Sequence, residues 1–597
     1  MRLINTTTFE FKEFFSGIPP YAILSHTWGT EHGSEVTFKQ WLARNATPIT
    51  SAGLAKILKS CEIAAAEDLQ YVWVDTCCID KSSSAELTEA INSMFMWYHR
   101  AQVCYVYLED LSSFPAAYEG QIDTWKRCRW FTRGWTLQEL IAPKDVRFYD
   151  NAWRTIGTKL RLRRQLEDVT SVNSRVLDGR TPLGVICVAE KMSWAARRTT
   201  TRKEDMAYCL LGLFGVNMPL LYGEEDNAFL RLQEHIIQKT NDLSIFTWSP
   251  PCLVARPEVD VARGCLAESP ADFASCNFVS RRDTFGMMEP EFVMTNKGIR
   301  LETSRDLVYT TVSPVAGELR TSYILRLGCY TGLQNAVEIV VPLQKWGRDI
   351  FARDPSRPNT FNKVDYVEKP AFEKRQTIYL IVSLPAHTSI RQSQTLLPLF
   401  QRAASCMAVL HIEPLACPDV MAYVYNRWPS NHFDAERNLF MASVGMLGKQ
   451  WTACRFHVSP ADLSDAGSLD DEHVMLPAVF YLVVIWSIRP SPRNDEEFSY
   501  LLLERPAWEQ DFETDAISEL LTEVADNFKS PYNLQKALAI HTDTGRDWNR
   551  PLTIVRTIGR RRQPLSIDCT RRVEYDSRVC LGPVWRVSIN FEAGESY

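Results

Sequence analysis

Short apolar runs alternate with helical repeats over the first part of the chain. The apolar runs predict strands at residues 21–25, 71–75, 103–108 and 146–149. Residues 53–67, between the first two runs, place their apolar side chains on one face of a helix. Strands that are apolar on both faces and alternate with amphipathic helices are typical of a parallel sheet covered by helices on both sides. The pattern therefore predicts an α/β domain.

Two further helices are expected in the same part of the chain. Ser83 and Glu86 have the spacing of a capping box, in which each side chain bonds the backbone amide of the other residue, so a helix should begin there. A polar loop separates the strand at 103–108 from a helix expected near residues 130–141. Trp135 and Glu139 are four residues apart and would share one face of that helix.

The pattern changes near residue 245, where helical repeats give way to short alternating strands. Such strands, separated by turns and loops, are typical of β-sandwiches. We expect an α/β domain over residues 1–160, a helical extension over 161–245, and a β-rich region over 246–597 with one or two sandwich-like units. The strands predicted in that region cover residues 292–302, 323–327, 337–341, 377–384, 407–412, 500–503 and 584–591.

The composition indicates an ordinary globular protein. Of the 597 residues, 45% are hydrophobic and 23% are charged, and the net charge of −6 argues against a nucleic-acid partner. The most hydrophobic run, residues 474–488, is too short for a membrane span and is expected to be a buried strand. The 16 cysteines contain no CxxC pair, which indicates reduced thiols. With no signal peptide either, we expect a cytoplasmic protein without a membrane span.

Polar and aromatic residues gather where the predicted strands end. Ligands of open parallel sheets bind beyond the carboxyl ends of the strands. The first two strands lead directly into such residues, and the third leads into the loop before the helix near 130–141. We therefore expect a binding site made of Ser25, His26, Trp28, Gly29, Asp75, Cys77, Asp80, Arg133, Trp135 and Glu139.

The chemistry of this set suits a nucleotide sugar. An aromatic ring such as Trp135 can stack a base, and an arginine such as Arg133 can hold phosphate. A carboxylate such as Glu139 can engage ribose hydroxyls or stabilise a developing oxocarbenium ion. No phosphate-binding GxxxxGK[ST] loop, GxGxxG, HExxH or GxSxG motif is present, which disfavours P-loop NTPases, ordinary Rossmann oxidoreductases, zincin proteases and standard esterases.

Each candidate residue also has a structural interpretation. Packing in the core is the alternative for Trp28, Trp135, His26 and the pair Cys77 and Cys78. A cysteine nucleophile would need a paired histidine, and His26 is the nearest candidate in the sequence. Asp75 could simply cap the turn that follows its strand. Glu139 could form a surface ion pair with Arg133.

Three motifs resemble those of the fungal heterokaryon-incompatibility (HET) domain, in the same order. They are YAILSHTWG at residues 21–29, WVDTCCIDK at 73–81 and RGWTLQEL at 133–140. The segments at 202–212 and 221–224 resemble the part of the family that follows, so the resemblance covers about residues 1–245. It implies a role in non-self recognition that ends in growth arrest or cell death.

The HET domain is in turn distantly similar to the Toll/interleukin-1 receptor (TIR) domain, which implies a TIR- or flavodoxin-like parallel sheet with helices on both faces. The third motif resembles the TIR pattern SxWCxxEL, whose glutamate is catalytic in members that cleave NAD. Trp135 then matches the tryptophan and Glu139 the catalytic glutamate, whereas Thr136 replaces the cysteine. TIR-like sites are often completed by a second copy, so a homo-oligomer is also implied.

These expectations combine into one leading hypothesis, an NAD(P)+ glycohydrolase that releases nicotinamide. Glu139 would stabilise the oxocarbenium-like sugar, and Trp28 and Trp135 would stack the rings of the substrate. Ser25 and Asp75 would hydrogen-bond the ribose or a phosphate-bound water, and Arg133 would hold the phosphates. NAD+ or NADP+ is the substrate, and no further cofactor and no metal is expected.

Two other hypotheses remain open. The domain could act without catalysis by self-association, or it could be a nucleotide-binding sensor without turnover. An activating protein partner is expected, and the sequence does not name it. Because a resting toxin must be kept inactive, we also expect the β-rich region to pack near the strand ends of the first domain or to block its assembly.

Overall fold

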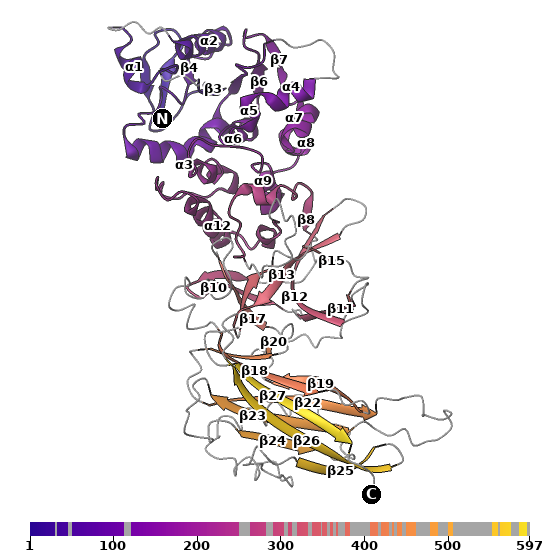
Figure 1. Cartoon of the computed structure of the whole chain (residues 1–597). Helices are drawn as coiled ribbons and strands as arrows, with labels where there is room; N and C mark the ends of the chain where they lie inside the picture. The colour runs from indigo at the N-terminus through magenta and orange to yellow at the C-terminus, as the bar shows by residue number, and fades with distance from the viewer. Residues whose placement is uncertain are drawn as a thin grey trace.

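The chain is arranged in three successive parts, which Figure 1 shows from the indigo N-terminus to the yellow C-terminus. The structure is a computed structural model, and it describes residues 1–29, 33–45, 51–112, 121–249, 263–281 and 291–303. Beyond residue 303 it describes the strands given below with short adjoining segments, and it describes side chains in places as far as residue 382.

A seven-stranded sheet organises the N-terminal part. Its strand order is β2 (Phe11–Glu13), β1 (Arg2–Asn5), β4 (Tyr71–Trp73), β3 (Ala22–His26), β5 (Val103–Tyr107), β6 (Val146–Tyr149) and β7 (Thr155–Thr158). The predicted strands β4, β3, β5 and β6 run parallel, as expected. The outer strands β2, β1 and β7 are antiparallel to their neighbours and were not predicted, because runs of three or four residues are too short to show a period.

The parallel strands follow the order second, first, third, fourth along the chain. Helix α1 (Phe38–Ala43) and helix α2 (Ala52–Ala66) connect β3 to β4, and α3 (Ser84–Arg100) connects β4 to β5. Figure 1 shows α2 on one side of the sheet and α3 on the other. The strand order reverses between β3 and β5, which is the place where doubly wound sheets open a crevice for a ligand. The predicted α/β class is therefore confirmed, with a mixed sheet in place of a wholly parallel one.

The start of α3 differs in one detail from the predicted capping box. Ser83 accepts a hydrogen bond from the backbone amide of Glu86, as predicted. The carboxylate of Glu86 instead accepts from the backbone amide of Asp80 and pairs with Arg2 at 2.9 Å. Only half of the box forms, because the N-terminal strand supplies a cation that the local sequence does not reveal.

The prediction of one continuous helix near residues 130–141 is wrong. Two short helices take its place, α5 (Arg129–Thr132) and α6 (Thr136–Ile141), and α4 (Gln121–Arg127) precedes them. The helical conformation is interrupted at Gly134, whose backbone amide donates to the carbonyl of Thr199. A Cβ on Gly134 would lie 2.6 Å from a methyl carbon of Thr200, so the close approach of the later segment requires glycine there.

The helical extension begins after β7 and is largely helical, as predicted. Its helices are α7 (Arg163–Thr170), α8 (Ser174–Leu177), α9 (Val188–Ser193), α10 (Asp205–Tyr208), α11 (Leu211–Phe214) and α12 (Asn227–Lys239), with short 3₁₀ turns η1 (Leu183–Val185), η2 (Leu243–Phe246) and η3 (Pro270–Phe273). One continuous apolar core joins these helices to the sheet. The closest approach is at Gly212 of α11, which packs directly on Phe95 of α3.

Gly212→Ala is expected to destabilise the protein by about 2–3 kcal/mol, because overpacking forces neighbouring elements apart. The added Cβ would overlap the Cβ of Phe95, an atom that cannot move without its backbone. Denaturant unfolding of the purified chain measures the change. Gly184→Ala is the matched control, since a Cβ there meets nothing within 4 Å. Equal stability of the two variants would contradict the prediction.

The β-rich region begins with one ten-stranded sheet. Its strands are β8 (Val279–Arg281), β9 (Phe292–Thr295), β10 (Gly298–Thr303), β11 (Val308–Val312), β12 (Leu319–Thr331), β13 (Val337–Lys345), β14 (Ile350–Arg353), β15 (Thr360–Phe361), β16 (Tyr366–Val367) and β17 (Gln376–Leu380). These strands form one sheet. The β-rich character of this part is therefore confirmed, whereas the expected number of sandwich-like units stays a prediction.

Two further sheets follow. The six-stranded sheet contains β18 (Cys406–Leu415), β20 (Phe433–Asp434), β21 (Leu439–Ser443), β25 (Leu552–Ile558), β26 (Arg561–Glu574) and β27 (Val584–Ala593). The four-stranded sheet contains β19 (Val420–Trp428), β22 (Lys449–Pro460), β23 (Ala478–Ser487) and β24 (Ser499–Glu504). Each of the seven predicted strands of the β-rich region overlaps a strand of the structure, although β17 ends at Leu380 and residues 381–382 are not strand. Residues 383–384, and residues 474–477 and 488 of the hydrophobic run, lie outside the described residues.

The β-rich region meets the rest of the chain at the helical extension. Strand β9 packs on α12. In the described part of the chain, this region therefore contacts the helical extension, whereas its expected block of assembly stays a prediction. Within the described part of the chain, no helix is both long and apolar enough to cross a membrane.

Candidate functional site

Glu139 lies where the strand order of the sheet reverses. Helix α6 carries it against the end of β3, and its side chain points inward with 8% of the residue exposed. The hydroxyl of Ser25, the fourth residue of β3, donates to a carboxylate oxygen of Glu139 at 2.5 Å. The indole of Trp130 donates to the same hydroxyl at 2.8 Å, so the direction of the serine proton is set. The alternative of a surface ion pair between Glu139 and Arg133 is wrong.

The surroundings hold Glu139 in its protonated form at neutral pH. Burial is the main cause, and it raises the pKa of Glu139 to about 8 against the hydrogen bond from Ser25, which lowers it. The nearby carboxylate of Asp75 raises the pKa further, whereas Arg133 and the hydroxyl of Tyr98 lower it. A carboxyl group with such a perturbed pKa at the reversal of the strand order is a candidate for chemistry.

Asp75, Trp28 and Lys81 form the outer part of the same site. The indole of Trp28 donates to Asp75 at 2.9 Å, and the ammonium of Lys81 lies 3.9 Å from the same carboxylate oxygen. Lys81 also stacks on the Trp28 ring at 3.6 Å, and 38% of Trp28 is exposed. Asp75 therefore orients an exposed aromatic ring, and Lys81 covers one face of that ring. Lys81 was not among the predicted site residues, although it ends the second motif.

His26 and Gly29 shape the loop after β3. Both depend on Glu35, whose carboxylate accepts from the amide of Gly29 at 2.9 Å and lies 3.4 Å from His26 Nε2. The buried ammonium of Lys56 donates to Glu35 at 2.9 Å. Burial alone would raise the pKa of Glu35, but His26 and Lys56 lower it to about 2. Sequence analysis missed Glu35, because it stands in a loop without a repeating pattern.

Glu35→Gln is expected to destabilise the protein by about 2 kcal/mol at neutral pH, because it leaves the buried charge of Lys56 with a hydrogen bond to the Thr27 carbonyl and, among the described residues, with Glu109, 3.6 Å away, as its counter-charge. The folded pKa of about 2 lies below the usual 4.5, so this stabilisation is present above pH 4.5 and is lost as the pH falls toward 2. Denaturant unfolding should show a difference between variant and wild type at neutral pH that shrinks in acid. Glu62→Gln, which removes an exposed partner of Lys59, is the control.

Two predicted site residues lie apart from Glu139. Cys77 is fully buried, and burial beside Cys78 and Cys61 raises its pKa well above the usual value for a thiol. It is therefore a packing residue, and its prediction as a ligand contact is wrong. The carboxylate of Asp80 bonds the hydroxyl and the amide of Ser82 in the turn before α3, so it is a structural residue too.

Trp135 also points away from the site. It stands at the start of α6, and its indole is within hydrogen-bonding reach of Asp205 in α10. Tyr222 donates to the same carboxylate at 3.0 Å. Helix α6 lies between the sheet and the helical extension. Glu139 therefore contacts β3, whereas Trp135 contacts α10. The expectation that these two side chains would flank one ligand is wrong.

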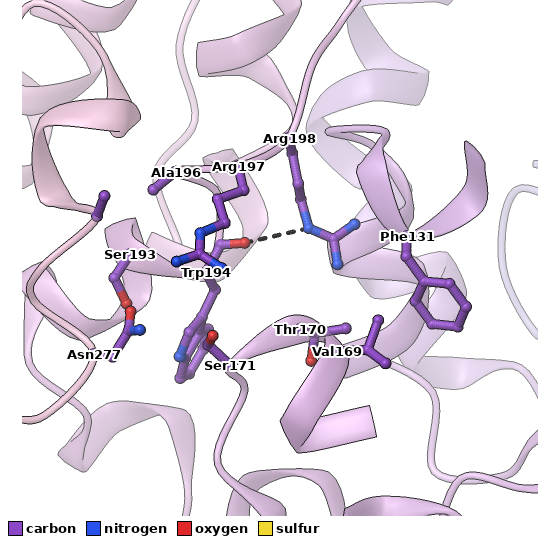
Figure 2. A pocket seen from close by; sticks show the side chains of 11 residues that line it. Phe131, Val169, Thr170, Ser171, Ser193, Trp194, Ala196, Arg197, Arg198 and Asn277 are labelled. Atoms are coloured by element: carbon purple, nitrogen blue, oxygen red, sulfur yellow. Dashed lines mark hydrogen bonds between the residues drawn. The ribbon is translucent and has the colours of Figure 1, made fainter. Parts of the chain in front are cut away.

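Arg198 links the helical extension to the helix that carries Glu139. Figure 2 shows its guanidinium in a small cavity with Phe131 and Trp194. It donates to the carbonyl of Arg133 at 2.8 Å and to the hydroxyl of Thr136 at 2.9 Å, the residues that lead into α6. Among the described residues its second terminal nitrogen has no partner, and the cavity of about 30 Å³ has room for one water. The extension therefore fixes the position of α6, a role that no local sequence signal indicates.

The structure thus brings together about half of the predicted residues. Ser25, Trp28, Asp75 and Glu139 lie in one site with the positive charge of Arg133, and Tyr98, Lys81 and Trp130 join them. His26 and Gly29 support the adjoining loop.

Comparisons with known proteins find similar sequences for the N-terminal part of this chain. Residues 21–118 match the family described as heterokaryon incompatibility protein (HET), and residues 227–313 match a domain of unknown function (DUF8212). The vegetative incompatibility protein HET-E-1 of Podospora anserina is 47% identical over 231 residues, which are 38% of this chain. The match spans only 17% of that relative's own length. No solved structure matches the chain.

The family match and the motifs point to the same elements. The matched residues 21–118 contain β3, β4 and β5, and with them Ser25, Trp28 and Asp75. Glu139 follows this range and is tied to it by its hydrogen bond with Ser25. The N-terminal part of this chain is therefore similar to heterokaryon-incompatibility (HET) domains.

Proposed function

We propose that this protein is a fungal incompatibility effector whose N-terminal domain cleaves NAD+ or NADP+ and thereby causes cell death. The HET domain and the similarity to a vegetative incompatibility protein support the biological role. The reaction rests on one observation, the buried Glu139 carboxyl at the reversal of the strand order, held by Ser25 and Tyr98. The distant TIR resemblance of the third motif supports the same residue.

In the proposed reaction the bond between ribose C1′ and the nicotinamide nitrogen breaks. Its electron pair stays with the nicotinamide nitrogen, which neutralises the pyridinium ring, and positive charge develops on the sugar. The Glu139 carboxylate stabilises that charge, and water then adds to C1′ and releases a proton. The products are nicotinamide, an ADP-ribose product and a proton.

Other residues of the site have supporting roles. Ser25 donates to Glu139 and so favours its ionised form. Trp28 is exposed enough to stack on a substrate ring, and it replaces Trp135 in that role. Arg133 supplies positive charge for the phosphates and favours the Glu139 carboxylate. Lys81 covers Trp28, so it must move aside for a ring to stack there.

Nicotinamide release from NAD+ and NADP+, measured by chromatography, tests the proposal. Below its pKa of about 8 the free Glu139 is mostly protonated, so kcat/KM should rise about tenfold per pH unit toward pH 8 and then level. Ser25→Ala should move this midpoint to higher pH, because the Ser25 hydrogen bond lowers the pKa of Glu139. Thr88→Ala, which removes an exposed hydroxyl on α3, is the control. It should change neither kcat/KM nor the midpoint of its pH dependence. A rate that does not change with pH would contradict the role of Glu139.

A second candidate function rests on the closed state of the site. Ser25 is fully buried and Glu139 is nearly so. Lys81 covers the exposed ring of Trp28. A closed site suits a domain that signals by self-association without turnover, or one that binds a nucleotide only after opening. Calorimetry with NAD+ separates these candidates from the enzyme, because binding without nicotinamide release indicates a sensor. Neither binding nor release from an assembled sample favours self-association.

A further inference from the structure

A cleft lies where the helical extension meets the β-rich region, apart from the Glu139 site. Its walls come from η1 and α9, from the end of α12 and from β8. The volume is about 620 Å³, which falls within the range of small-molecule sites. The charged residues that line it are Glu190, Lys191, Lys239, Asp242 and Arg281.

Lys191 is the unusual residue of this cleft. Only 9% of it is exposed, and burial lowers the pKa of its ammonium group. Within the described residues its ammonium has no hydrogen bond or ion pair, and it lies 5.1 Å from the centre of the Phe214 ring. An ammonium that lines a cleft without a bonded partner is available to a ligand, so an anion in the cleft would gain a strong interaction with it.

Two more cations face the same space. Lys239 donates to the carbonyl of Gly215, which holds its ammonium at the end of α12. The guanidinium of Arg281 lies 3.7 Å from Asp242. Three positive groups from α9, α12 and β8 thus converge on one cavity.

The two acids of the cleft do not balance this charge. Asp242 is engaged by the backbone amides of Val188 at 2.8 Å and Ser244 at 3.0 Å, besides Arg281. Burial raises the pKa of Glu190 to about 7, although Lys191 lowers it, so at neutral pH this carboxyl is about half protonated. The cleft therefore carries net positive charge.

We propose that this cleft binds a small organic anion that carries phosphate or carboxylate groups, with Lys191 as its central contact. The ligand would touch α9, α12 and β8 together and so join the helical extension to the ten-stranded sheet. The site does not depend on the proposed cleavage of NAD(P)+, and its test does not use nicotinamide release.

Isothermal titration calorimetry of the full-length chain tests the site, with inorganic pyrophosphate and citrate as separate probes in about 150 mM salt. At least one probe should bind saturably, and the stronger one identifies phosphate or carboxylate as the preferred group. Lys191→Met should weaken that binding about tenfold or more, because a charge-assisted hydrogen bond is lost. Lys203→Met is the matched control, since Lys203 pairs with Glu225 and Asp226 on the surface of the same extension.

Glu190→Gln provides a test in the opposite direction. Removing the competing negative charge beside Lys191 should tighten binding about twofold or more, an effect that a damaged fold would not produce. Saturable binding that Lys191→Met weakens and Glu190→Gln tightens supports the site. Absence of saturable binding by either probe up to about 10 mM overturns it, as does wild-type affinity in Lys191→Met.

Discussion

Glu139→Gln is expected to reduce nicotinamide release by about a hundredfold to a thousandfold, the loss typical when one group that stabilises transition-state charge is removed. Glutamine keeps the size of the side chain and can still accept the Ser25 hydrogen bond. It cannot carry the negative charge that the oxocarbenium-like sugar requires. The loss should therefore appear in kcat, with KM for the dinucleotide less affected.

The comparison needs a wild-type sample that turns over NAD+ or NADP+, assembled if assembly is required. Glu62→Gln, which alters an exposed carboxylate on α2, is the matched control and should keep the wild-type rate. Equal rates in wild type and Glu139→Gln would overturn the assignment of Glu139. Cell killing by Glu139→Gln at wild-type strength would instead favour signalling by self-association.

The same substitution should stabilise the protein at alkaline pH. The folded pKa of Glu139, about 8, lies above the usual 4.5, so the folded state holds this proton more tightly than the unfolded state. The stability associated with that proton is fully present below pH 4.5 and is lost as the pH rises through 8, by about 1.4 kcal/mol per pH unit. Glutamine does not titrate and avoids this loss. The variant should exceed the wild type by as much as about 5 kcal/mol above pH 8.

Denaturant unfolding at acidic, neutral and alkaline pH measures this difference. In acid the two proteins should be equally stable, and the advantage of Glu139→Gln should grow steadily with pH. Lower stability of the variant at every pH would mean that the ionised carboxylate is stabilised by its surroundings, contrary to the burial described above. A group that lowers stability and is needed for turnover is typical of a functional site.

The central sheet was predictable because its signal is local. The strands β3, β4, β5 and β6 are short and mostly apolar, and such a run identifies a strand that is largely buried on both faces. Strand-end geometry then placed Ser25, Asp75 and Glu139 near one another, and their hydrogen bonds and charges agree with that placement. The three motifs then added the resemblance to the HET family.

The errors share a different cause, which is contact with distant segments. Gly134 breaks the predicted helix because residues 199–200 pack against it, and Trp135 turns to Asp205. Cys77 is only two residues from Asp75 in sequence but is packed in the core. The sequence next to these residues does not indicate contacts with segments that are distant in the chain.

The sequence by itself determined the α/β class of the first domain, the β-rich character of the rest, the HET resemblance and the position of Glu139 at a strand-end crevice. These properties follow from periodicity and from motifs, which are local. Only the tertiary structure decided that Glu139 is buried with a raised pKa, that Glu35 and Arg198 support its surroundings, and that three cations meet in the cleft beside α9. Burial and charge pairing depend on residues that are far apart in the chain, so they exist only once the chain has folded.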